Sequence, residues 1–127
     1  MKTTDSGRRR HRRRAVQLEV TLRFRAPRAL RDKVADLTLI GRTKDLSEGG
    51  IAVIVSAGNI DRYLKQKENN FDVELKLPTG LITFEAVPIH FRRISPGVGY
   101  LIGSRISVLP AQQQALLTEF LKSLPLV

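Results

Sequence analysis

The chain has 127 residues, of which 42% are hydrophobic and 27% are charged, a composition typical of one globular domain. It has no cysteine, so disulfide frameworks and thiolate metal sites are excluded. No apolar run approaches the roughly 20 residues of a membrane-spanning helix, and no apolar segment follows the basic N-terminus as it would in a secretory signal. These features predict a cytoplasmic protein.

The positive charge of the chain is concentrated at its N-terminus. The formal net charge is +10. Residues 1–14 hold seven basic residues against one acid, Asp5, and so carry +6, whereas residues 15–127 carry +4. Because like charges repel one another and cover no core, we predict a flexible arginine-rich arm over residues 1–14 and a single domain over residues 15–127. Such an arm attracts phosphates, whether on nucleic acid, anionic lipid or a nucleotide.

Short apolar runs, separated by turns rich in glycine, proline and polar residues, fill the chain as far as residue 108. The first run alternates strictly, with an apolar side chain at every second position from Val16 to Phe24, which predicts a half-buried strand. Residues 59–67 fit either one or two helical turns or a loop. The runs predict strands at 16–24, 34–43, 51–55, 71–77, 81–94 and 100–108. Strands joined by short turns are typical of an antiparallel barrel or sandwich.

The C-terminal segment changes to a helical period. Pro110 suits a first helical turn, and a helix is predicted over about residues 110–124. Its apolar stripe consists of Ala115, Leu116, Leu117, Phe120, Leu121 and Leu124. We expect this stripe to cover an open end of the barrel, and a dimerisation or partner surface is the alternative.

Catalytic chemistry has little support in the sequence. His11 lies in the arm and His90 in an alternating strand, without metal-ligand spacing between them, so both are interpreted as surface or structural histidines. No glycine-rich phosphate loop and no obvious pair of acids for general acid/base catalysis is present. We therefore expect a protein that is not an enzyme and that holds neither a metal nor a cofactor.

Two polar clusters remain as candidate binding elements. Six arginines surround His11 in the arm, and arginine can hold a phosphate, or a guanine through its O6/N7 edge. Residues 45–50 read Asp-Leu-Ser-Glu-Gly-Gly, which fits a simple polar turn. The same residues also fit a ligand site, because a carboxylate and a hydroxyl can accept hydrogen bonds from a guanine and a glycine permits close backbone approach or a positive φ. Each cluster alone leaves both interpretations open.

Taken together and in this order, the two clusters resemble the PilZ family of cyclic di-GMP receptors. The family motifs are R-x-x-x-R in an N-terminal arm and [D/N]-x-S-x-x-G in a turn between strands, and the second is matched by Asp45, Ser47 and Gly50. Residues 99–106 resemble a late glycine-containing strand of the family. The resemblance implies a mostly β fold: a six-stranded antiparallel β-barrel with a C-terminal α-helix and a flexible basic N-terminal arm.

The resemblance also implies a ligand site for cyclic di-GMP. Three frames fit R-x-x-x-R, pairing Arg8 with Arg12, Arg9 with Arg13, or Arg10 with Arg14, and the frame of Arg9 and Arg13 is preferred from its spacing to Val16. Arg8 then precedes the motif, as in family members that bind a stacked, intercalated ligand dimer. The site predicted for cyclic di-GMP consists of Arg8, Arg9, Arg13, Asp45, Ser47 and Gly50.

The resemblance further predicts that the ligand orders the arm over the barrel and thereby changes the surface shown to a downstream protein partner. Two other functions stay open. One is a small β-barrel that binds nucleic acid, and the other is a degenerate PilZ adaptor that acts only through protein contacts. An arm that binds anionic membranes is less favoured, because no apolar anchor adjoins it.

Overall fold

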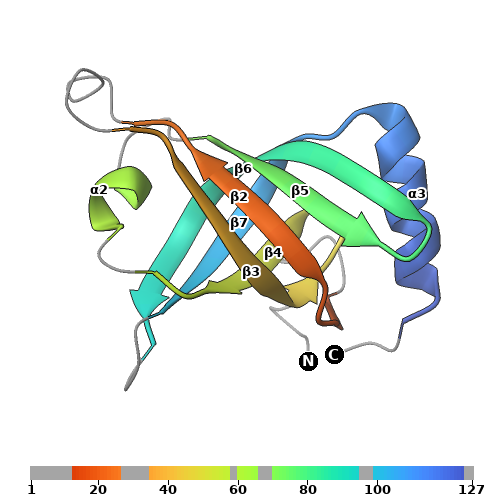
Figure 1. Ribbon diagram of the computed structural model, residues 1–127. Coiled ribbons are helices and arrows are strands. Elements are labelled where there is room, and N and C mark those ends of the chain that lie inside the picture. The colour runs from red at the N-terminus through yellow and green to blue at the C-terminus, as the bar shows by residue number, and fades with distance from the viewer. Residues whose placement is uncertain (1–12, 27–34, 58–59, 66–69, 95–98, 125–127) are drawn as a thin grey trace, which may run out of the picture.

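The structure is a computed structural model that describes residues 13–26, 35–57, 60–65, 70–94 and 99–124. Its elements surround a single core and are drawn in chain order in Figure 1. The strands are β1 (Arg14–Ala15), β2 (Glu19–Phe24), β3 (Leu37–Leu46), β4 (Gly50–Val55), β5 (Phe71–Leu77), β6 (Gly80–Arg93) and β7 (Tyr100–Val108). The helices are α2 (Asp61–Leu64) and α3 (Ala111–Lys122).

Six of the strands close into an antiparallel barrel, which confirms the predicted fold class. The strands follow the order β3-β2-β5-β6-β7-β4, and a further pairing of β3 with β4 closes the ring. Every one of these pairings is antiparallel. The two-residue strand β1 lies outside the ring and pairs with the end of β3, with Ala15 opposite Asp45.

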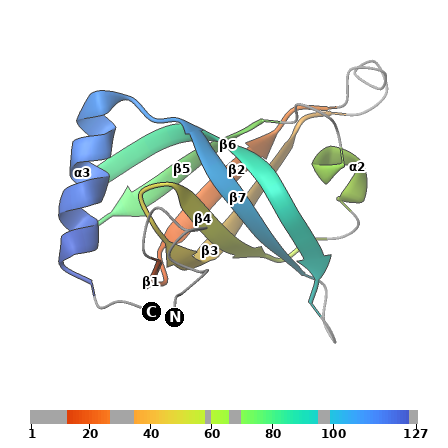
Figure 2. The same cartoon turned by 180° about the vertical axis from the view of Figure 1, so that it is seen from behind.

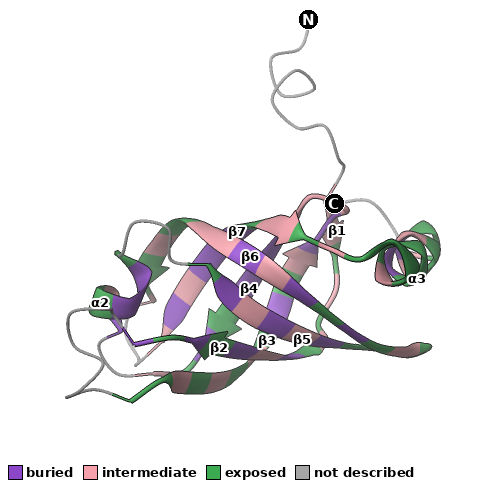
Figure 3. Cartoon of the chain, turned by 90° about the horizontal axis from the view of Figure 1, so that it is seen from above, coloured by how far each residue is buried: buried purple, intermediate pink, exposed green. Residues whose placement is uncertain are grey.

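The core lies inside the barrel because the strands alternate between apolar and polar side chains. On β2, Val20, Leu22 and Phe24 are fully buried, while the residues between them face outward. Figure 3 shows the same banding along the other strands. Phe24 stacks on Phe71 with 4.6 Å between the ring centroids, an arrangement favoured by the charge distribution of aromatic rings.

Most predicted strands agree with the observed ones, and two differ at their ends. β5 and β7 have the predicted bounds, β4 begins one residue early, and β6 both begins and ends one residue early. The strand predicted at 34–43 instead spans Leu37–Leu46, because the pairing with β1 extends the ladder beyond residue 43. Val34 lies outside the described residues. The strand predicted at 16–24 enters the ladder only at Glu19.

The delayed start of β2 has a local cause in Thr43, a buried polar residue of β3. Its hydroxyl accepts a hydrogen bond from the Leu18 amide at 2.9 Å and donates one to the Val16 carbonyl. Together with one backbone bond, from the Thr43 amide to the Leu18 carbonyl at 3.0 Å, these side-chain bonds connect residues 16–18 to β3 in place of a regular ladder. The ladder of β3 with β4 shifts register between Thr43 and Asp45, so Lys44 is the extra residue of a β-bulge.

The two helices of the described residues lie at opposite ends of the barrel (Figures 1 and 2). Leu117 and Leu121 of α3 are buried in the core, with Phe120 and Leu124 packed against it, so this helix covers one end as predicted. At the other end, the predicted helical turns or loop of residues 59–67 contain the short helix α2. No helix among the described residues has both the length and the apolar character needed to cross a membrane.

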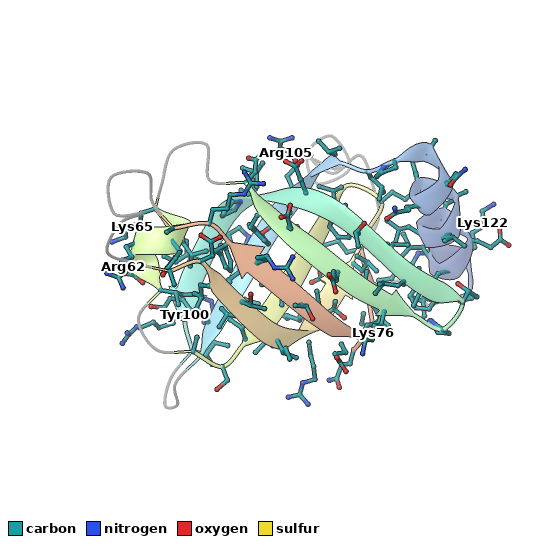
Figure 4. All side chains as sticks on the ribbon, turned by 45° about the horizontal axis from the view of Figure 1, so that its top comes forward. Arg62, Lys65, Lys76, Tyr100, Arg105 and Lys122 are labelled. Carbon is teal, nitrogen blue, oxygen red and sulfur yellow. The ribbon has the colours of Figure 1, made fainter. Side chains whose placement is uncertain are left out.

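A polar network fixes α2 to the barrel wall. The Tyr100 hydroxyl donates to the Asp61 carboxylate at 2.6 Å and accepts hydrogen bonds from Arg93 Nε at 3.2 Å and from the Ile60 amide at 3.4 Å. Figure 4 shows Tyr100 beside α2 and far from Lys122 on α3. The hydrogen bond from Tyr100, aided by the charge of Lys65, lowers the pKa of Asp61.

Candidate ligand-binding site

The turn between β3 and β4 is built around Ser47. Its hydroxyl oxygen accepts hydrogen bonds from the amides of Gly49 at 3.2 Å and Gly50 at 3.0 Å, while its own amide donates to the Gly50 carbonyl at 2.9 Å. The side chain is only 4% exposed. A serine at this position therefore satisfies two backbone donors that the reversal of the chain would otherwise leave without partners.

Gly50 allows β4 to approach β7 closely. A Cβ atom added at Gly50 would lie 3.0 Å from the Ser104 carbonyl oxygen, tighter than ordinary contact with a backbone atom. Among the described glycines, only Gly80 has a positive φ. Of the two reasons that the sequence offered for this glycine, close approach is thus the one that applies.

Asp45 connects the Asp-x-Ser-x-x-Gly motif of the turn to the arginine cluster through an ion pair with Arg13. Its carboxylate lies 3.1 Å from Arg13 Nη1, and the two side chains are 16% and 30% exposed, respectively. The contact follows from the backbone, because the ladder of β1 with β3 places Ala15 opposite Asp45. Two residues that are 32 positions apart in the chain thus form one ion pair on the outer wall of the barrel. Arg8 and Arg9 lie outside the described residues.

Arg14, next to Arg13, has a different partner. Its guanidinium donates to the carbonyl of Leu124, directly after α3. The turn also contacts this helix, because the Thr118 hydroxyl donates to the Glu48 carboxylate at 3.0 Å. The last residue of the arm and the middle of the turn are therefore connected to α3 or to the segment that follows it.

The ladders place further residues in the same row across the strands as Asp45, and the sequence analysis did not assign them to the site. Ala52 lies opposite Asp45, Gly103 opposite Ala52, and His90 opposite Gly103. The His90 ring lies where a side chain at Gly103 would have to be, so the glycine leaves room for it. Between the Asp45 carboxylate and the His90 imidazole, the row therefore contains only the small residues Ala52 and Gly103. His90 had been interpreted as a surface or structural histidine.

Arg105 extends the site in the same way. It lies directly opposite Gly50 in the ladder of β4 with β7, and its side chain is exposed (Figure 4). Arg105 adds a cation next to the turn, on the side away from Arg13. Only the register of the strands reveals this neighbour, because it lies far from both motifs in the sequence. No group of His, Cys, Asp and Glu within the described ranges is placed to hold a metal ion.

The barrel and its site define a class of protein, a small β-barrel domain with a polar site on its outer wall beside a basic N-terminal segment. The family model of the PilZ domain matches residues 7–123. The chain therefore belongs to the PilZ domain family. The comparison with curated proteins found no match.

Several solved structures share the fold. The PilZ domain of YcgR from Escherichia coli, solved with cyclic di-GMP, is 19% identical with a TM-score of 0.65, and the match covers 92% of this chain and 91% of that one. The inhibitor of motility MotI/DgrA of Bacillus subtilis is 21% identical with a TM-score of 0.64, over 91% of this chain and 50% of that one.

The regulatory factor MrkH of K. pneumonia is 19% identical with a TM-score of 0.67, over 91% of this chain and 50% of that one. The chain thus spans half the length of MotI/DgrA and of MrkH. At these identities, the likeness concerns the fold.

Proposed function

We propose that this PilZ domain is a receptor for cyclic di-GMP and acts as an effector of that second messenger. The PilZ family is a cyclic di-GMP-binding domain rather than a catalytic one, and the YcgR domain with the same fold was solved with this ligand. The observation that carries the proposal is the ion pair of Arg13 with Asp45, since it joins the arginine motif and the Asp-x-Ser-x-x-Gly motif at one place.

The chemistry of the pair suits a guanine nucleotide. A carboxylate such as that of Asp45 can accept hydrogen bonds from the N1–H and N2–H₂ edge of guanine, and a guanidinium can grip a phosphate or the O6/N7 edge. Without ligand, Arg13 and Asp45 neutralise each other at 3.1 Å. On binding, Arg13 exchanges the carboxylate for a phosphate or a guanine O6/N7 edge of the ligand, and Asp45 exchanges the guanidinium for the neutral N–H donors of a guanine, so both keep hydrogen-bond partners.

The remaining motif residues have different roles in the proposed site. Ser47 and Gly50 shape the turn, because the serine hydroxyl is already bonded to the amides of the turn and the glycine admits the neighbouring strand. Arg105 lies where it can meet a second phosphate. Because Arg14 is bonded to the carbonyl of Leu124, Arg13 is the arginine available at Asp45.

This arrangement favours the frame of Arg9 and Arg13 for the R-x-x-x-R motif. In that frame, Arg9 grips the ligand together with Arg13, and Arg8 stacks on a base of an intercalated ligand dimer. The domain organisation proposed with it is an arm of residues 1–14 on a domain of residues 15–127, in a cytoplasmic protein.

We further propose that the ligand orders the arm over the barrel and so changes the surface offered to a protein partner. The contacts with α3 support this output, since Arg14 and Glu48 connect both halves of the site to one helix. A ligand that contacts both the arm and the turn therefore contacts two elements that are each hydrogen-bonded to α3 or to the segment that follows it. Such a change is a shift between two states, driven by contacts that exist only in one of them.

Calorimetric titration with cyclic di-GMP tests the site. Arg13→Ala and Asp45→Asn should each weaken binding at least about tenfold, because a charge-assisted hydrogen bond contributes roughly 1.5–3 kcal/mol. Arg23→Ala and Asp72→Asn are matched controls, since this arginine and this aspartate lie opposite each other on the outer wall of β2 and β5. Unchanged affinity in both site variants would exclude the proposed site.

The nucleic-acid-binding alternative has less support from the structure. All seven aromatic residues lie in described segments, and each of them is buried or half-buried. Single-strand-binding barrels use exposed aromatic side chains as stacking platforms, and this barrel offers none. A short oligonucleotide in the same titration should therefore bind only weakly, with an affinity that falls steeply as salt is added.

A further inference from the structure

Three apolar side chains lie next to one another on the outer wall of β3, β4 and β7. Ile40 is 66% exposed, Ile54 is 38% exposed, and Leu101 is half-buried. Ile54 lies directly opposite Leu101, while Ile40 lies two residues before Arg42, which is the partner of Ile54 on β3. We name these three side chains the outer apolar patch. Figure 2 shows β4 and β7 on the near side of the barrel, with β3 next to β4.

Arginines border this patch on both sides. Arg42 lies opposite Ile54, and Arg92 lies opposite Leu101, so one row across four strands reads arginine, isoleucine, leucine, arginine. Both arginine side chains are exposed. Neither forms an ion pair with another residue of the described segments. The outer apolar patch is therefore the centre of a surface whose rim is positively charged.

The acidic residues closest in register do not neutralise this rim. Asp45 is the only acid on β3, β4 and β7, and its carboxylate is paired with Arg13. Glu19 lies opposite Arg42 in the ladder of β2 with β3, but its carboxylate is 3.1 Å from Lys76. The surface thus offers cations without partners around exposed apolar groups, which favours an occupant with the opposite charge.

We propose that the outer apolar patch, with Arg42 and Arg92, binds a segment of another protein that presents an apolar side chain between carboxylates. Buried apolar anchors and rim charges are the parts from which protein interfaces are built. A second copy of this chain is disfavoured because it carries the same +10 charge and the same arginines. Nucleic acid would leave the apolar centre uncovered.

An anionic membrane is the remaining occupant of similar charge, and the geometry disfavours it. All three side chains lie on strand positions of the barrel wall, and only Ile40 is more than half exposed, so the patch offers a single well-exposed isoleucine to a bilayer. One isoleucine with a few cations gives marginal membrane binding at most. A protein segment can follow the wall and cover all three side chains.

Selection of short random peptides against the full chain tests this proposal without knowledge of the partner. Enriched peptides should combine Asp or Glu with Leu, Ile or Phe, and their synthetic versions should bind roughly tenfold or more weakly to Ile40→Glu and to Arg42→Glu. Leu81→Glu and Lys122→Glu are matched controls, since Leu81 is 53% exposed at the β5–β6 turn and Lys122 is exposed on α3. These controls should bind the peptides like the wild type.

The other outcomes overturn the proposal. It fails if no peptide is enriched, or if the enriched peptides bind Ile40→Glu and Leu81→Glu equally well. It also fails if vesicles containing anionic lipid or an oligonucleotide bind the wild type and lose binding in Ile40→Glu, since the surface would then serve a membrane or nucleic acid. Cyclic di-GMP titration of Ile40→Glu, expected to match the wild type, separates failure here from failure of the proposed function.

Discussion

At the α2 end of the barrel a buried tyrosine joins two charged side chains in one network, whereas at the α3 end the two charged motif residues bond, among the described residues, only to each other. Tyr100 joins the side chains of Asp61 and Arg93 in one network, and its hydroxyl is covered by the fold. At the other end, Arg13 and Asp45 form one ion pair on the outer wall. The difference separates polar groups that stabilise the fold from polar groups that can exchange their partners for a ligand.

The largest effect on stability should come from the α2 end. Tyr100→Phe removes the donor to Asp61 and the acceptor for Arg93 and for the Ile60 amide, so it should lower the free energy of unfolding by about 2–3 kcal/mol. Urea unfolding followed by circular dichroism measures this loss. Tyr63→Phe, which removes a single hydrogen bond to the Ala35 carbonyl, should cost less.

The same variant also tests whether the two ends are independent. Tyr100→Phe should bind cyclic di-GMP with the affinity of the wild type, because Tyr100 lies far from the site at the β3–β4 turn (Figure 4). A weaker affinity in a protein that remains folded would show that the two ends are coupled, and the comparison above would then be wrong.

A smaller loss is expected at the turn itself. Ser47→Ala removes the acceptor of the Gly49 and Gly50 amides and should cost about 1–2 kcal/mol of unfolding free energy. Unlike Tyr100→Phe, it should also weaken the binding of cyclic di-GMP, because the turn that positions Asp45 loses its internal bonds. Ser107→Ala, which removes one hydrogen bond to the Glu85 carbonyl, is the control and should leave affinity unchanged. Equal affinity in Ser47→Ala and in the control would mean that the turn holds its shape without the hydroxyl.

The contact of the turn with α3 should contribute less again. Thr118→Val removes the donor to the Glu48 carboxylate while keeping the size of the side chain, with an expected cost of about 0.5–1 kcal/mol in unfolding free energy. Thermal unfolding measures this cost, with Glu119→Gln on the exposed side of α3 as the control. A loss of unfolding free energy as large as that of Ser47→Ala would mean that the contact with α3 stabilises the turn as much as the hydrogen bonds of Ser47 do.

The smallest effect concerns the pH dependence of stability. The pKa of Asp61 is lowered in the folded protein, so folding favours its ionised form. That contribution is present above the ordinary pKa of about 3.9 and is lost as the pH falls through this value and then through the lowered folded-state pKa. Between about pH 5 and pH 3, the wild type should lose more stability than Asp61→Asn in urea unfolding. If the unfolding free energies of the two proteins fell in parallel with pH, Asp61 would not contribute to the pH dependence of stability.

Much of the barrel can be predicted from alternation in the sequence, while its irregular parts cannot. The ends of β5 and β7 could be predicted because each strand is flanked in the sequence by a polar turn or by a change of hydrophobic pattern. The end of β3 could not, because its bulge at Lys44 and the side-chain bonds of Thr43 depend on a strand that arrives from elsewhere in the chain. Such tertiary bonds have no local sequence pattern.

The site divides in the same manner. The motif residues Asp45 and Arg13 could be named in advance, and the structure brings them together at 3.1 Å. Their neighbours His90 and Arg105 could not, because the register of β4, β7 and β6 decides which side chains lie beside the turn, and β6 contains two irregularities of its own. The register between strands is set when the ring closes, so it cannot be predicted from the pattern of any single strand.

The closure of the ring by β3 and β4 limits how this domain can recognise other macromolecules. Each of the six ring strands has a neighbour on both sides, and the ladders occupy both edges of every strand over part of its length. One edge extends beyond the ladders at residues 87–93 of β6, which pair with β7 alone, and at residues 37–40 of β3, which pair with β2 alone. An incoming peptide therefore finds free backbone groups only along these short stretches, so recognition by β-augmentation is confined to them. Elsewhere on the ring, specificity resides in outward side chains, which can change one at a time without disturbing the hydrogen bonds that hold the barrel together.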